Sequence, residues 1–276
     1  MDLATRWLLA AIVAFTLPSA LFAKDEKKKA HAAAPAKDEA DIEQIREELG
    51  VNGFTAPSIE HLLAELMVLR PIPIEKLWRD VPPEMPETRA KIALRSGRII
   101  ADGLLAIIAE KPSRIEAPAR ALVRYGKALG VADHITKHSK SLLEKAAKEN
   151  WLDLRKELVK SQADVEAGML GLKDEEIAHM VSLGGWFRGL EAVSLLVADD
   201  YTPDHAKLLV QPEALDYFID RIGTLDPTAK DDKVFQTIAK NLKTIQAATV
   251  KENEQPPTLE EVKEVHKLAA QVVELL

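Results

Sequence analysis

Two pairs of opposite charge stand inside segments that are otherwise strongly apolar. Arg98 and Asp102 are four residues apart, and Arg188 and Glu191 are three apart, so each pair would share one face of a helix. The protein interior solvates ions poorly, and a buried charge is therefore stable only when it is paired. Both pairs predict a polar contact between helices, which either fixes how the helices pack or binds a ligand.

The second pair lies among an unusual number of glycines. Gly184, Gly185 and Gly189 fall inside the segment 174–198, where each weakens a helix by up to about 1 kcal/mol relative to Ala. Trp186 lies between them. Because glycine has no side chain, these positions predict the close approach of another backbone or of a ligand.

These residues have a structural and a functional interpretation. In the structural one, the segments 87–110 and 174–198 pack together as central helices, and each carboxylate pairs with an arginine of the same or the facing helix. In the functional one, a pocket between the two helices binds a small molecule. The candidate residues are the same in both cases: Arg95, Arg98, Asp102, Gly184, Gly185, Trp186, Arg188 and Glu191.

Two histidine spacings have the form of partial metal sites. His134 and His138 would share a helical face, but Ile135 stands where a zinc protease has its glutamate. Glu176 and His179 form half of a di-iron carboxylate pattern, and the chain has no second Glu-x-x-His. We therefore predict no metal and no other cofactor, and we expect the histidines at 134 and 138 to face solvent.

The rest of the sequence lacks the patterns of catalysis and of nucleic-acid binding. It has no cysteine, no Gly-x-Ser-x-Gly and no glycine-rich phosphate loop. The net charge is −7, and aromatic residues are not interleaved with basic ones. We predict a protein that is not an enzyme and does not bind nucleic acid.

The composition predicts an all-α fold. Ala, Leu, Lys and Glu abound, and only 5% of residues are aromatic. Apolar residues recur at helical spacing, which predicts an irregular bundle of about eight core helices. Gly130 and Gly223 suit the position just after a helix, and Thr258 with Glu261 forms a capping-box pattern. The expected helices lie near 87–110, 116–129, 132–149, 151–170, 174–198, 204–222, 228–250 and 258–276.

The N-terminus has the pattern of a secretory signal peptide over residues 1–23. Arg6 precedes an 11-residue apolar run, Trp7 to Leu17, and small residues at Ala20 or Ala23 offer a cleavage site. An uncleaved anchor is the alternative, but the stretch from Trp7 to Ala23 contains Pro18 and has only 17 residues, which is short against the roughly 20 residues of a spanning helix. We expect no later segment apolar enough to span a bilayer. The protein would then be periplasmic or secreted, with no stable membrane span after cleavage.

The remainder divides into a tether and one helical domain. Residues 24–56 are charged and rich in Ala, which predicts a flexible tether with one short helix. Residues 57–276 form the domain, with a proline-rich lead-in over 57–86 and a docking helix over 258–276. A weak similarity at an offset of 93 residues relates the neighbourhoods of Tyr125 and Phe218. It suggests two repeated units, about 87–170 and 174–250, as one interpretation of the domain.

These features predict an exported, non-enzymatic binding or interaction protein with an unknown protein or small-molecule partner. The alternative is a periplasmic sensor or carrier whose pocket lies between the helices around Arg98 and Arg188. A metalloprotein or a hydrolase with a site that the sequence does not reveal is the third interpretation.

Overall fold

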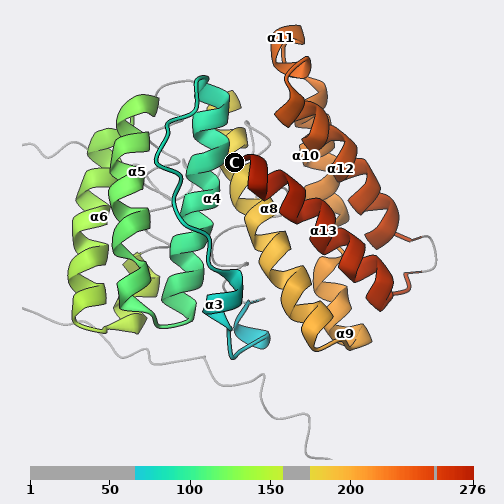
Figure 1. Ribbon diagram of the computed structural model, residues 1–276, viewed down its shortest axis with the longest axis horizontal. Coiled ribbons are helices and arrows are strands. Elements are labelled where there is room, and N and C mark those ends of the chain that lie inside the picture. Colours follow the sequence, from blue (N-terminus) through green and yellow to red (C-terminus); the bar gives the residue numbers. More distant parts are fainter. Residues whose placement is uncertain (1–65, 158–174, 252–253) are drawn as a thin grey trace, which may run out of the picture. The chain divides into compact units, whose positions relative to one another are not determined.

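The computed structural model describes residues 66–157, 175–251 and 254–276, which belong to one compact unit. Every regular element in this part of the chain is a helix, so the all-α prediction is confirmed (Figure 1). The expected signal peptide and tether lie outside the described residues. The elements are α3 (Ile74–Leu77), α4 (Arg89–Ile108), η2 (Pro112–Arg114), α5 (Glu116–Leu129), α6 (Ala132–Ala147), α8 (Glu175–Asp199), α9 (Pro203–Ala206), η3 (Lys207–Leu209), α10 (Pro212–Gly223), α11 (Pro227–Lys230), α12 (Lys233–Thr249) and α13 (Leu259–Leu275).

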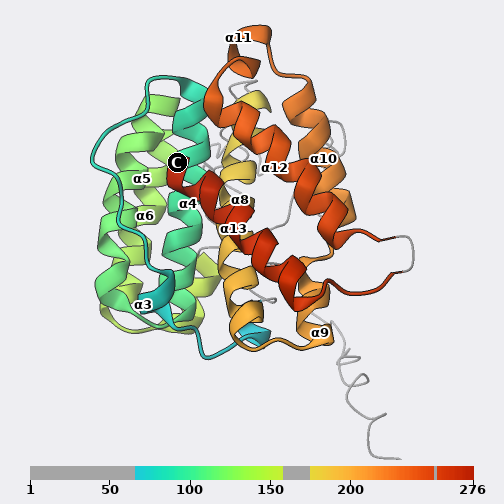
Figure 2. The same ribbon diagram turned by 45° about the vertical axis from the view of Figure 1, so that its right-hand side comes forward.

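Helices α4 and α8 pack against each other more extensively than any other pair, as Figures 1 and 2 show. Both are buried around most of their circumference, which agrees with the prediction of two central helices. α5 packs on α4, and α6 packs on α5. α13 lies on α8 and also contacts α12, which packs on α10. Helices from distant parts of the sequence therefore meet on the α4–α8 pair.

The C-terminal helix α13 begins and docks as its sequence indicates. The Thr258 hydroxyl accepts a hydrogen bond from the Glu261 amide, and the Glu261 carboxylate accepts one from the Thr258 amide. This reciprocal pair satisfies two amide groups that the first helical turn leaves free. The apolar residues that recur at helical spacing along this helix are all buried, as expected of a docking helix: Val262, Val265, Leu268, Ala269, Val272 and Leu276.

The two glycines expected just after helices behave differently. Gly130 ends α5 in the left-handed region with φ of 87°, as expected. Gly223 is still part of α10, and Thr224 follows it with right-handed dihedrals, so the expectation for Gly223 was wrong. The Thr224 amide donates to the carbonyls of Asp220 and Arg221, which extends the helical pattern by one residue.

Two of the expected helices are each divided in two. The segment 204–222 contains α9 and η3, followed by a new start at Pro212, the first residue of α10. Proline has no amide hydrogen and favours the first helical turn over the interior. The segment 228–250 contains α11 and α12, and the Asp232 side chain caps α12 by accepting from the Val234 amide.

One expectation about membranes also needs correction. By length and composition alone, α8 over Glu176–Asp199 is apolar enough to cross a bilayer, with a mean hydropathy of 1.3. We had expected no such segment after the N-terminal run. In the protein, 78% of the 18-residue apolar stretch of this helix is buried, as the core helix of a bundle requires.

Candidate functional site

The central helices touch through backbone atoms at two glycines. A β-carbon built on Gly97 would lie 1.8 Å from the Val181 carbonyl oxygen, and one on Gly184 would lie 1.9 Å from that of Leu94. Gly185 faces Gly97 at the wider distance of 3.4 Å from its hypothetical β-carbon to the carbonyl oxygen. The predicted close approach at 184 and 185 is confirmed, and the group that approaches is another helix. The backbone of that helix occupies the space that a ligand would need at this crossing.

Arg188 is the centre of a buried charge cluster beside this crossing. It is only 1% exposed, and each of its three guanidinium nitrogens has a partner inside the protein. Its Nε donates to Asp102 Oδ1 at 2.6 Å, its Nη1 donates to Glu191 Oε2 at 2.9 Å, and its Nη2 donates to the Leu77 carbonyl. One side chain thus joins α4, α8 and the end of α3.

Glu191 has a second arginine partner that the sequence did not indicate. Arg79, which follows α3, donates from Nε to Glu191 Oε1 at 2.9 Å. Although burial lowers the pKa of Arg79, the hydrogen bond and charge attraction of Glu191 raise it overall. The Glu191 backbone carbonyl lies 3.1 Å from His266 Nδ1 of α13. This turn of α8 is therefore contacted both by α13 and by the segment that follows α3.

Asp102 lies between two arginines and is almost fully buried. Arg98 Nε is 3.4 Å from Asp102 Oδ2, without the geometry of a hydrogen bond, while Arg98 Nη2 donates to the Asp80 carbonyl at 2.9 Å. Burial raises the pKa of Asp102 above its ordinary value, and the charges of Arg188 and Arg98 oppose that rise without cancelling it. The prediction that Asp102 pairs with an arginine of the same or the facing helix is confirmed, and it pairs with one of each.

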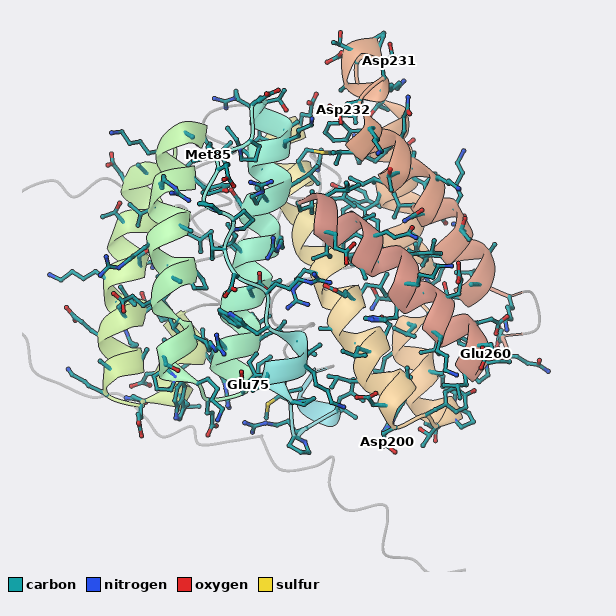
Figure 3. All side chains as sticks on the ribbon, viewed as in Figure 1. Glu75, Met85, Asp200, Asp231, Asp232 and Glu260 are labelled. Atoms are coloured by element: carbon teal, nitrogen blue, oxygen red, sulfur yellow. The ribbon has the colours of Figure 1, made fainter. Side chains whose placement is uncertain are left out.

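The cluster comprises three arginines and two carboxylates: Arg79, Arg98, Asp102, Arg188 and Glu191. Glu274 of α13 lies near enough to Arg79 to raise its pKa and partly offsets the excess positive charge. Acidic residues outside the cluster are in a different setting. Glu75, Asp200 and Glu260, labelled in Figure 3, have side chains 71%, 86% and 82% exposed. Because each guanidinium nitrogen of Arg188 bonds to a different segment, the cluster links α3, α4 and α8.

Two of the predicted site residues lie apart from this cluster. Arg95 donates from Nη1 to the Glu84 carbonyl at 2.7 Å. Trp186 donates from Nε1 to Gln211 Oε1 at 2.8 Å, and its ring packs against that of Phe218 of α10 with centroids 5.4 Å apart. These two predicted residues therefore contact other neighbours than the cluster does.

The expected solvent-facing position of His138 was wrong, because this imidazole is only 3% exposed. Its Nδ1 lies 3.0 Å from Glu157 Oε1, and Lys145 Nζ donates to Glu157 Oε2 at 3.0 Å. Burial opposes ionisation of Glu157, but the hydrogen bonds from His138 and Lys145 lower its pKa overall. The side chain of His134 lies outside the described part of the structure.

His179 is a second buried imidazole, 5% exposed. Its Nδ1 hydrogen-bonds with the Tyr217 hydroxyl of α10, and its Nε2 has no hydrogen-bond partner. Burial, followed by the charge of Arg221, lowers the pKa of His179 to about 4. Glu176 is exposed, so it does not share a site with His179. Within the described ranges, no three His, Cys, Asp or Glu side chains gather as metal ligands do.

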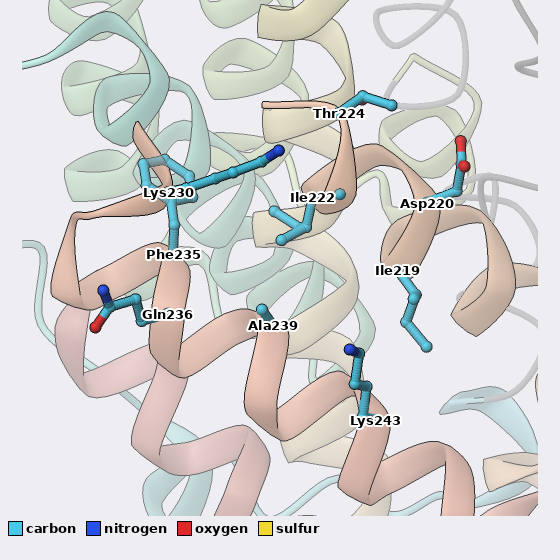
Figure 4. Close-up of a pocket in the computed structure, with 10 residues that line it drawn as sticks. Ile219, Asp220, Ile222, Thr224, Lys230, Phe235, Gln236, Ala239 and Lys243 are labelled. Carbon is cyan, nitrogen blue, oxygen red and sulfur yellow. The ribbon is translucent and has the colours of Figure 1, made fainter. Parts of the chain in front are cut away.

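A groove that the sequence did not indicate lies between α10 and α12, with a volume of about 590 Å³ (Figure 4). Its floor is apolar, with Ile222 and Phe235 buried and Ile219 and Ala239 half-buried. The polar residues at its rim come from three segments: Asp220, Thr224, Lys230, Gln236 and Lys243. We call this space the α10–α12 groove.

The sequence matches no known family model, and neither a curated protein nor a solved structure shows significant similarity to it.

Proposed function

We propose that this chain is an exported, non-enzymatic helical binding protein and that the α10–α12 groove is its binding site. The observation that carries the proposal is the groove itself, an apolar concavity of about 590 Å³ with a few polar groups at its rim. Small-molecule sites usually have this character, with volumes of roughly 300–1,000 Å³.

The buried charge cluster supports the same choice of site. A pocket between the helices around Arg98 and Arg188 was the alternative location for a ligand. There, however, the guanidinium of Arg188 bonds to Asp102, Glu191 and a backbone carbonyl, and the helices touch at Gly97 and Gly184. Displacing these partners would leave buried charges unpaired. The α10–α12 groove needs no such rearrangement.

Export is supported by the N-terminal sequence. Residues 1–23 combine one basic residue, an 11-residue apolar run and a small-residue exit, as secretory signals do. A binding protein with this signal would act in the periplasm or outside the cell.

The proposal is tested on the full chain expressed in the cells that make it. N-terminal sequencing of the mature protein should begin near Lys24, in the periplasm or the medium. Native mass spectrometry of that protein should show a bound small molecule of defined mass. An intact Met1 in a membrane fraction would contradict export, and a mature protein free of any bound molecule would contradict the binding function.

A further inference from the structure

We propose that the α10–α12 groove binds a small amphipathic carboxylate, with its apolar body on the groove floor and its carboxylate at two lysines of the rim. This inference rests on the proposed binding function and adds the class of ligand to it.

The floor of the groove defines the apolar part of the ligand. Ile222 and Phe235 are 5% and 3% exposed, and their side chains line the groove together with Ile219 and Ala239. Along α12 the lining runs from Phe235 to Lys243, which at about 1.5 Å per residue spans about 12 Å. A surface of this length suits a short acyl chain or one to two rings.

The rim defines the polar part. Lys230 and Lys243 line the groove from α11 and α12. Asp226 lies near enough to Lys230 for their charges to interact, but no described residue forms a hydrogen bond or a salt bridge within 4.0 Å with either ammonium group. Many other surface lysines have an acidic partner, as in the pairs Lys76–Asp199 at 3.0 Å and Lys263–Glu260 at 2.9 Å. The two groove lysines are thus available to an anion, and a carboxylate accepts charge-assisted hydrogen bonds from such groups.

The directions of the side chains agree with this assignment. Figure 4 shows the Lys230 side chain lying over Phe235, with its ammonium group pointing across toward Ile222 and Thr224. The carboxylate of Asp220 lies at the far edge and is 3.8 Å from Arg221 Nη2, so it does not pair with either groove lysine. The residues that line the rim therefore carry two positive charges and one negative charge, and Asp226 outside the lining offsets part of the charge of Lys230. The lining itself still favours an anion over a cation.

Gly223 lines the groove on the α10 side. A β-carbon built on Gly223 would meet no atom within 4 Å, and its backbone is in the ordinary helical region. A larger side chain there should enter the groove without disturbing the fold. This position therefore provides a variant that blocks the site while keeping the protein folded.

The experiment measures octanoate and 1-octanol binding to the full chain by titration calorimetry. Octanoate should bind at least tenfold more tightly than octanol. Gly223→Leu should weaken octanoate binding more than tenfold without lowering the melting temperature. The double variant Lys230→Gln with Lys243→Gln should weaken octanoate about tenfold and leave octanol within twofold. Lys240→Gln, on the same helix but outside the groove lining, is the matched control and should bind as wild type does.

The possible failures separate the two proposals. If octanol binds as tightly as octanoate, or if the lysine variants bind octanoate normally, the ligand class is wrong. The binding function then stands provided that Gly223→Leu blocks octanol. If neither probe binds, the ligand class is again wrong, and native mass spectrometry decides whether the binding function holds. A cellular molecule that is present on wild type and absent from Gly223→Leu keeps the binding function, and no bound molecule on wild type overturns both.

Discussion

A buried arginine is stable in this protein because three different segments supply its acceptors. Asp102 comes from α4, Glu191 from α8 itself and the Leu77 carbonyl from the end of α3. Each acceptor satisfies a different guanidinium nitrogen of Arg188, so no large desolvation cost is left uncompensated. The packing of these three segments against one another therefore depends on Arg188 and its partners.

Replacement of Glu191 by alanine should strongly destabilise the protein. It removes the carboxylate that contacts both Arg188 and Arg79, and it leaves the three arginines of the cluster with Asp102 as the remaining carboxylate of the cluster. Removing one member of a buried pair typically costs about 3–5 kcal/mol in the free energy of unfolding. Urea denaturation measures this loss. Glu144→Ala, at a side chain 61% exposed, should change the same quantity by less than about 0.5 kcal/mol. An unchanged midpoint for Glu191→Ala would show that the cluster adds no stability.

Part of this cluster was visible in the sequence. Charges inside apolar segments indicated that Arg98, Asp102, Arg188 and Glu191 are buried and paired, because such charges are otherwise too costly. Arg79 was not visible, because it lies in a proline-rich connector where an arginine would ordinarily be solvated. Only the three-dimensional path of that connector brings it to Glu191.

At the scale of whole elements, the sequence was most informative where a local rule determines the structure. The capping box at Thr258 and the left-handed Gly130 follow from backbone hydrogen bonding and from the lack of a β-carbon. The breaks before Pro212 and at Asp232 were missed, although both positions carry a local signal. Pro212 begins a new helix because it lacks an amide hydrogen, and the Asp232 side chain caps the first turn of α12.

The contact between α4 and α8 makes glycine at position 97 necessary. In Gly97→Ala the new methyl group would meet the backbone of Val181, which is unable to move aside as a flexible side chain would. Overpacking usually costs about 1–3 kcal/mol, and we expect a loss of at least about 3 kcal/mol here because the obstacle is backbone.

The matched control is Gly223→Ala, where the same methyl group meets nothing within 4 Å. It should raise the free energy of unfolding by up to about 1 kcal/mol, because alanine favours the helix and restricts the unfolded chain. Urea denaturation compares the two variants directly. Equal effects at both positions would contradict the claim that α4 and α8 touch through Gly97.

At the scale of the whole molecule, the sequence indicated which helices are central but not how the outer ones meet. The α10–α12 groove depends on the spacing of two helices that are joined through α11, and no residue pattern marks it. The apolar sequence of α8 likewise fits two different settings, the core of a helical bundle and a membrane span. Its apolar length alone would suit a bilayer, but here α4 and α13 cover most of it.

The buried His179 should make the stability of the whole protein depend on pH. Its pKa is about 4 in the folded protein, against 6.5 for an ordinary histidine, because burial disfavours the charged imidazole. Between these values the unfolded chain binds a proton that the folded chain does not, so stability falls as the pH drops from about 6.5 to about 4. The full shift corresponds to at most about 3 kcal/mol. His179→Leu should remove this part of the pH dependence, whereas Tyr217→Phe should keep most of it, because the imidazole stays buried. Urea denaturation at several pH values gives both curves, and parallel curves for wild type and His179→Leu would show that His179 does not titrate on unfolding.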